Sequence, residues 1–172
     1  ISRVNFLTGQ LKENKLLRDS WMELALYRKG AADYKGAEEI WVYVTKIWPL
    51  NYVAFANLGD LHVNYLKDYG KAEAYLLEAV SVEPTYIEGY RRLDNLYRFH
   101  YKVGSGADLS ILERGLENNP NNPGILVPLA EYYKEKGNNA KALEYYRLAL
   151  SEAEKAGDTG FADALKKEIE NL

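Results

Sequence analysis

Residues 55–84 have the sequence FANLGDLHVNYLKDYGKAEAYLLEAVSVEP, and this stretch decides the fold. Its apolar residues recur at intervals of three and four on both sides of Gly70, which is the period of a helix buried along one face. Pro84 closes the stretch, because proline cannot continue the hydrogen-bond ladder of a helix. We therefore predict two antiparallel helices, with Gly70 in the turn between them, where glycine relieves backbone strain.

Three more segments follow the same pattern, in residues 21–49, 90–120 and 126–154. A leucine recurs at intervals of 34, 35 and 36 residues: Leu24, Leu58, Leu93 and Leu129. A proline recurs at intervals of 35 and 36 residues: Pro49, Pro84 and Pro120. No segment alternates between apolar and polar residues as a strand does. The sequence therefore predicts four helical hairpins in tandem.

Small and large residues occupy fixed positions in these segments. The recurring leucine is followed by a small residue in three of them: Ala25, Gly59 and Ala130. Alanine recurs in three of the second helices: Ala37, Ala72 and Ala142. Four residues after this alanine position, each of the four second helices carries a large residue: Trp41, Leu76, Leu112 and Tyr146. Small residues let two helices approach closely, and large ones fill the space beside the contact.

This pattern resembles the tetratricopeptide repeat, a unit of about 34 residues with W-x2-L-G-x2-Y, then A-x3-F, then a closing proline. The resemblance covers roughly residues 18–154. The third repeat departs from the pattern at two small-residue positions, which hold Asp94 and Asp108. The first repeat departs from it at Arg28, where a large packing residue is expected.

The resemblance implies an all-α fold, a right-handed superhelical solenoid of four antiparallel hairpins with a C-terminal capping helix. Residues 18–156 hold the repeats, at about 18–51, 52–86, 87–122 and 123–156. Residues 157–172 follow a glycine-rich helix stop and place three apolar side chains on one helical face: Phe161, Leu165 and Ile169. We assign this last segment to the capping helix.

Residues 1–17 precede the first repeat and carry five apolar side chains: Phe6, Leu7, Leu11, Leu16 and Leu17. Two interpretations stay open, a helical remnant packed on the first repeat and a linker from an upstream anchor. Because the first residue is Ile1 and not Met, we expect a trimmed or processed chain. The localisation stays open, and a soluble domain of a longer anchored or exported protein is one alternative.

Composition excludes several classes of function. The net charge of −3 argues against nucleic-acid binding, which needs a strong basic excess or a basic stripe. The absence of cysteine excludes disulfides, thiol catalysis and cysteine metal sites. No apolar run approaches the roughly 18 residues of a membrane span.

Residues that could carry chemistry are few. His62 occupies the position of a large packing residue, so we predict a buried histidine, and we expect His100 on the surface or in a groove. Neither has a second ligand at a metal-binding helical spacing. Residues 104–106, Gly-Ser-Gly, lack the strand and the Lys-Ser/Thr of a phosphate loop and are expected to form a stretched turn. We predict no catalytic, cofactor or metal site, and no enzyme.

The resemblance implies that a partner binds on the concave face, which in this family is lined mainly by the first helix of each hairpin. Helical phase places the polar side chains of two repeats there, and these are the peptide-binding residues that we predict: Asn57, Asp60, Asn64, Arg91, Arg92, Asn95 and Arg98. In the fourth repeat the same face carries Val127, Glu131 and Lys134.

Three arginines cluster in the third repeat of a chain with an acidic excess: Arg91, Arg92 and Arg98. Guanidinium groups pair with carboxylates in two-pronged fashion, so we expect an acidic or C-terminal-carboxylate segment as the ligand. Asn57 and Asn95 are expected to bond its backbone. The alternative is that nearby carboxylates neutralise the arginines, namely those of Asp60, Glu88 and Asp94.

The leading hypothesis is a non-enzymatic scaffold that binds a peptide or helix of a partner protein in the concave groove. The alternative is a structural or assembly module that self-associates, or that packs on the rest of a longer and membrane-anchored chain. An exposed apolar end at residues 1–17 would favour this alternative. The oligomeric state stays open.

Overall fold

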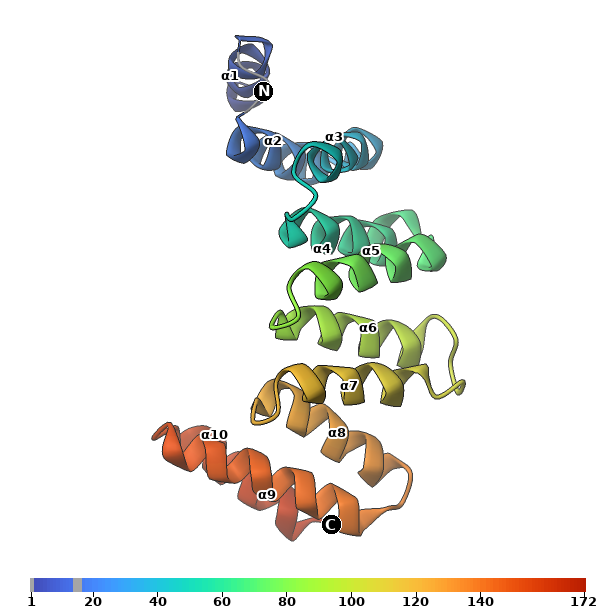
Figure 1. Cartoon of the computed structure of the whole chain (residues 1–172), viewed down its shortest axis with the longest axis vertical. Coiled ribbons are helices and arrows are strands. Elements are labelled where there is room, and N and C mark those ends of the chain that lie inside the picture. Colours follow the sequence, from blue (N-terminus) through green and yellow to red (C-terminus); the bar gives the residue numbers. More distant parts are fainter. Residues whose placement is uncertain (1, 14–16) are drawn as a thin grey trace. The chain divides into compact units, whose positions relative to one another are not determined.

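The computed structural model describes residues 2–13 and 17–172, and this part of the chain contains helices and turns but no strand. Figure 1 shows the helices in chain order. Their bounds are α1 Ser2–Glu13, α2 Arg18–Gly30, α3 Tyr34–Ile47, α4 Tyr52–Leu61, η1 His62–Leu66, α5 Tyr69–Val82, α6 Ile87–Phe99, α7 Ala107–Asn118, α8 Pro123–Glu135, α9 Asn139–Lys155 and α10 Thr159–Glu170. The all-α class, the four hairpins and the C-terminal helix are confirmed.

The chain divides into two compact units, Ile1–Glu83 and Pro84–Leu172. The first unit holds α1 to α5 and the second holds α6 to α10. Each unit has its own buried residues, and the recurring leucines are among them: Leu24 and Leu58 in the first, Leu93 and Leu129 in the second. The register predicted from these leucines is therefore the register of the cores.

The helix ends follow from local chemistry. Each second helix before a recurring proline ends two residues ahead of it: Ile47 before Pro49, Val82 before Pro84 and Asn118 before Pro120. Short polar side chains cap several of the helices by accepting a hydrogen bond from a backbone N–H, whereas α6 and α7 have no such cap. These caps are Asp33, Asn51, Asp68, Asn122, Asn138 and Asp158.

The turn of the second hairpin differs from the prediction. Gly70 lies inside α5, and the left-handed residue of the turn is Lys67, with φ of 56°. The equivalent residues in the first and fourth hairpins are Ala32, with φ of 61°, and Gly137, with φ of 72°. The prediction was wrong because the left-handed residue directly precedes the capping Asp or Asn, and Gly70 follows its cap, Asp68.

This turn geometry leads to a stability prediction. Lys67→Gly and Ala32→Gly should each stabilise the first unit by about 1 kcal/mol, because a left-handed conformation strains a side chain more than glycine loses in chain entropy. Gly137→Ala should destabilise the second unit by a similar amount. Urea unfolding followed by circular dichroism measures all three changes. Loss of stability in both glycine variants would contradict the geometry.

The π-helix η1 absorbs one extra residue in the second hairpin. From the recurring leucine to the capping residue the chain advances nine residues in the first and fourth hairpins, Leu24 to Asp33 and Leu129 to Asn138. In the second hairpin it advances ten, from Leu58 to Asp68. A single wider turn takes up such an excess without a longer loop. The five residues of η1 lie within this interval.

Helix α1 belongs to the first unit. Leu7 and Leu11 are buried in its core together with residues of α2, α3 and α4, and Arg3 forms an ion pair of 2.7 Å with Glu23 of α2. Leu16 lies outside the described residues. The apolar residues of residues 2–13 thus do not all face the core, because Phe6 remains 52% exposed.

Candidate protein-binding surface

The structure places the seven predicted site residues on the first helices of two hairpins. Asn57 and Asp60 lie on α4 and Asn64 on η1, all in the first unit. The other four lie on α6 in the second unit: Arg91, Arg92, Asn95 and Arg98. Within each unit, the surface presented by these first helices is called the first-helix face below.

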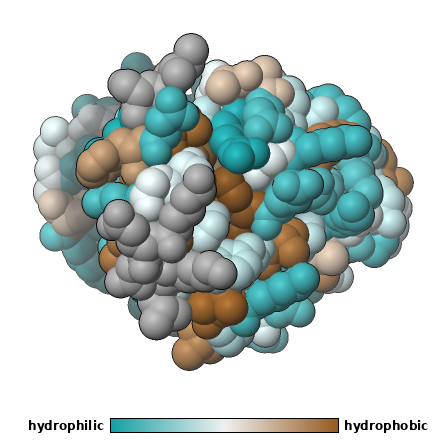
Figure 2. Space-filling view, turned by 90° about the horizontal axis from the view of Figure 1, so that it is seen from above, coloured by the Kyte–Doolittle hydropathy of each residue, from teal (hydrophilic) through white to brown (hydrophobic). Residues whose placement is uncertain are grey.

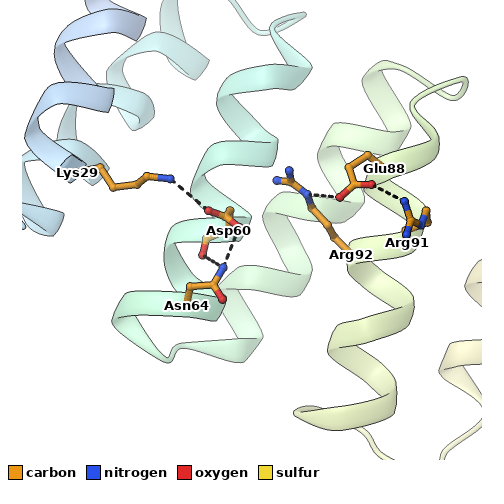
Figure 3. Close-up of polar contacts among 6 residues, drawn as sticks. All are labelled: Lys29, Asp60, Asn64, Glu88, Arg91 and Arg92. Carbon is orange, nitrogen blue, oxygen red and sulfur yellow. Dashed lines mark hydrogen bonds and ion pairs between the residues drawn. The ribbon is translucent and has the colours of Figure 1, made fainter.

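Asp60 is the centre of the polar contacts in the first unit (Figure 3). Its carboxylate lies 3.4 Å from the ammonium of Lys29 on α2 and accepts a hydrogen bond of 2.8 Å from the amide of Asn64. The same amide also donates to the backbone carbonyl of Asp60, at 3.1 Å. Asp60 and Asn64 are thus held by the protein itself.

Glu88 is the centre of the polar contacts on α6 that Figure 3 draws. Its carboxylate lies 3.2 Å from the guanidinium of Arg91 and 3.3 Å from that of Arg92. The side chains of the two arginines are 53% and 32% exposed. Ion pairs this exposed, three or four residues apart on a helix, contribute only about 0.2–0.5 kcal/mol. Both side chains therefore reach the solvent, and their ion pairs with Glu88 are weak.

Arg98 differs from the other two arginines because its side chain is only 12% exposed. It lies 3.7 Å from the carboxylate of Asp94, which is itself 6% exposed, and it also pairs with Glu135 of α8. Burial raises the pKa of Asp94 to about 6, although the charge of Arg98 acts in the opposite direction. Arg98 therefore pairs with a buried carboxylate, which agrees with the alternative that nearby carboxylates neutralise the arginines.

Arg98 is one member of a recurring type of ion pair. In three hairpins the last turn of the first helix carries a cation that reaches an acid on a later first helix or on α10: Lys29 to Asp60, Arg98 to Glu135, and Lys134 to Glu168. These cations all stand five residues after the recurring leucine. That spacing was visible in the sequence, but the acids lie 31 to 37 residues further on.

The two histidines occupy different surroundings. His62 is buried, its Nε2 lies 3.1 Å from the Glu38 carboxylate, and its ring stacks on Tyr75. Burial lowers its pKa, so it is a neutral packing residue near neutral pH, and the prediction of a core histidine is confirmed. His100 is exposed. Within residues 2–13 and 17–172, no group of three or more acidic or histidine side chains is placed to hold a metal.

Known proteins share both the repeat sequence and the fold of this chain. Residues 52–86 and 125–155 match the family model of the tetratricopeptide repeat. This chain contains tetratricopeptide repeats. A comparison of the sequence with curated proteins found no match.

Solved structures share the fold of this repeat protein. The crystal structure of MamA has a TM-score of 0.69 at 17% identity, covering 90% of this chain and 89% of the other. A MamA structure from Desulfovibrio magneticus has a TM-score of 0.65 at 17% identity, covering 91% and 86%. PilF of Pseudomonas aeruginosa has a TM-score of 0.62 at 21% identity, covering 96% and 81%. Likeness at these identities concerns the fold.

Tetratricopeptide repeat folds are typical of protein–protein interaction scaffolds, which generally have no enzymatic activity. This is the class of function that the family supports for the chain. Among the described residues of this repeat protein, no helix is both long enough and apolar enough to cross a membrane.

Proposed function

We propose that this protein is a non-enzymatic scaffold that binds a peptide or helix of a partner protein on its first-helix faces. The partner segment is acidic or ends in a free carboxylate, and Arg91 and Arg92 bind its carboxylates. Asp60 in the first unit and Arg98 in the second each stabilise the face of their own unit through ion pairs, and Asn64 donates a hydrogen bond to Asp60.

The observation that carries this proposal is the pairing of Arg91 and Arg92 with Glu88. Both arginines contact the same carboxylate over a single turn of helix, and both are accessible. A partner carboxylate can accept two parallel hydrogen bonds from the guanidinium of Arg91, a stronger arrangement than the single contact of that group to Glu88. A partner's carboxylate can therefore compete with Glu88 for these guanidinium groups.

Each unit carries one predicted amide on its own first-helix face, Asn57 in the first unit and Asn95 in the second. The side chains of Asn57 and Asn95 make no hydrogen bond within residues 2–13 and 17–172, so their donors and acceptors are available. An amide side chain can bond both the N–H and the C=O of an extended peptide. Asn95 is exposed on α6, one turn from Arg91 and Arg92. We propose that each amide bonds the backbone of a segment bound on the face of its own unit.

The test is fluorescence anisotropy with a labelled acidic octapeptide that ends in a free carboxylate, beside an amidated octapeptide with glutamine in place of every acid. Arg92→Glu should weaken binding of the acidic peptide about tenfold, the equivalent of roughly 1.4 kcal/mol. The melting temperature should change little, because an exposed pair contributes little to stability. Binding should also weaken with added salt, which screens exposed charges.

Arg147→Glu on α9 is the matched control, since Arg147 is an exposed arginine of the same unit on a second helix. It makes the same change of net charge and should leave binding nearly intact. If Arg92→Glu and Arg147→Glu weaken binding equally, the effect comes from net charge and the assigned site fails. Equal binding of the acidic and glutamine peptides rejects the acidic ligand.

Self-association is a second candidate function, and the apolar surface near α1 favours it. A hollow of about 670 Å³ between α1 and α2 is lined by Val4, Leu26 and Tyr27 among others. Phe6, Leu26 and Tyr27 are exposed. Figure 2 shows hydrophobic surface reaching the solvent between hydrophilic side chains on one face of the molecule. Light scattering at rising concentration distinguishes a self-associating module from a scaffold that stays monomeric.

A further inference from the structure

A second hollow lies in the unit of residues 84–172, between the first helix of the fourth hairpin and the C-terminal helix. It encloses about 490 Å³, and α8, α9 and α10 line it. Its apolar surface includes Val127, Phe161 and Leu165, and its rim includes Glu131, Glu135 and Glu168. Val127 and Glu131 lie on α8, the first helix of the fourth hairpin. The hollow combines a floor that favours hydrocarbon with a rim that favours positive charge.

One of the three rim carboxylates has no direct partner. Glu135 pairs with Arg98, and Glu168 lies 2.9 Å from the ammonium of Lys134. Glu131 forms no ion pair and no hydrogen bond within the described part of the chain. It is exposed, yet helices on either side displace part of its water, and this raises the pKa of its carboxyl. Glu131 can therefore gain from a cation brought by a partner.

Tyr146 of α9 supplies the second polar group. The residue is 2% exposed and lines the hollow, and its hydroxyl makes no hydrogen bond among the described residues. Burial raises the pKa of Tyr146 to about 12, and the charges of Glu131, Glu168 and Glu135 act in the same direction. The hydroxyl thus remains protonated in a negative field, and its oxygen can accept a hydrogen bond from a cationic donor.

We propose that this hollow binds a lysine or arginine side chain of the partner segment. Its aliphatic stem would lie on Val127, Phe161 and Leu165, and its charged group would reach Glu131 and the Tyr146 hydroxyl. Long cationic side chains bind in this way, with the stem on apolar surface and the head in a polar rim. Lys134 already places an ammonium on the rim, at Glu168.

This inference rests on the proposed function and gives the partner a finer description. Arg91 and Arg92 on α6 select an acidic residue, and the hollow between α8 and α10 selects a basic one. Both surfaces belong to the same compact unit. A segment with an acidic residue and a basic residue would complement the two, whereas a purely acidic segment would use only the first. Charge complementarity of this kind gives specificity more than affinity.

The experiment is a titration of the ¹⁵N-labelled protein with N-acetyl-leucyl-arginine amide, followed by chemical shifts. The uncharged analogue N-acetyl-leucyl-citrulline amide is the matched probe. We expect the arginine probe to shift amide signals at Val127, Ala164 and Leu165. Glu131→Gln should weaken its binding about tenfold, as expected for one charge-assisted hydrogen bond. The citrulline probe should bind the parent protein about as weakly as the arginine probe binds the Glu131→Gln variant.

A variant that fills the hollow tests the proposed binding independently of charge. Ala164 is exposed on α10 and lines the hollow, so Ala164→Trp should fill it and abolish the shifts while the unit stays folded. Ala74→Trp is the control, because Ala74 is exposed on α5 in the other unit. Retained binding in Ala164→Trp, or equal binding of the arginine and citrulline probes, overturns the inference. The acidic octapeptide keeps its affinity for Ala164→Trp in either case, so its response to Arg92→Glu judges the proposed function separately.

Discussion

Arg98→Ala is expected to destabilise the second unit by about 2–3 kcal/mol at pH 8, because the variant must either bury an unpaired Asp94 carboxylate or protonate it two pH units above its pKa of about 6. In this variant the Asp94 side chain, which is only 6% exposed, would stay buried and would lose its nearest cation. Glu135, the other partner of Arg98, is exposed and can return to solvent. The expected loss therefore comes almost entirely from the stranded charge of Asp94.

The loss should depend on pH, and the sign follows from Asp94. Its pKa is raised from 3.8 to about 6 in the folded protein, so the folded state holds a proton that the unfolded state releases between these values. Asp94 thus lowers stability as pH rises from about 4 to 6. Removing Arg98 raises this pKa further, so the additional loss in the variant should be small at pH 5 and large at pH 8.

Urea unfolding at both pH values measures this effect, and a double variant identifies its cause. Arg98→Ala combined with Asp94→Ala should recover most of the stability, because the first and fourth hairpins have Ala25 and Ala130 at the position of Asp94. Arg147→Ala, at an exposed arginine of α9, should change little. An equal loss at pH 5 and pH 8, or a double variant as unstable as the single one, would refute the explanation.

Gly59→Leu is expected to destabilise the first unit by about 1–3 kcal/mol, the usual range for overpacking. A Cβ on Gly59 would lie 2.5 Å from Cγ and 2.7 Å from Cδ2 of Leu76, and both residues are buried. Leu76 has no open space to move into, since it is fully buried. The contact between α4 and α5 would have to widen.

Gly30→Leu is the matched control, because a Cβ on Gly30 meets nothing within 4 Å. Leucine has a better helix propensity than glycine by several tenths of a kcal/mol, so this variant should be unchanged or slightly stabilised. Thermal unfolding by circular dichroism compares the two variants with the parent. If both melt at the temperature of the parent, the leucine register of the second hairpin is incorrect.

The fold could be predicted from the sequence because the residue pattern of the helical hairpin occurs four times. A single leucine or proline carries little information, but Leu24, Leu58, Leu93 and Leu129 recur with a common period and are all buried. The error at Gly70 was local. Glycine favours left-handed backbone, yet Lys67 adopts that conformation because the capping Asp68 fixes where the turn must close.

The candidate site could be predicted less well, because it depends on contacts between helices. Helical phase placed Arg98 on the same face as Arg91, but not beside Glu135, which is 37 residues away in the sequence. Asp94 was visible as a departure from the repeat, and its burial was not. Two arginines of one helix thus differ in role through partners that spacing along the chain does not specify.

The extra residue within η1 has a practical consequence for protein engineering. Residues of the second hairpin after Leu61 are shifted by one position relative to the other hairpins when all are aligned at the recurring leucine, here Leu58. One residue corresponds to about 100° around a helix. Counted back from the caps Asp33, Asp68 and Asn138, Asn64 shares a position with Lys29 and Lys134. A designer who grafts side chains between hairpins, or averages them into a consensus repeat, must therefore align this part of the second hairpin from its C-terminal end.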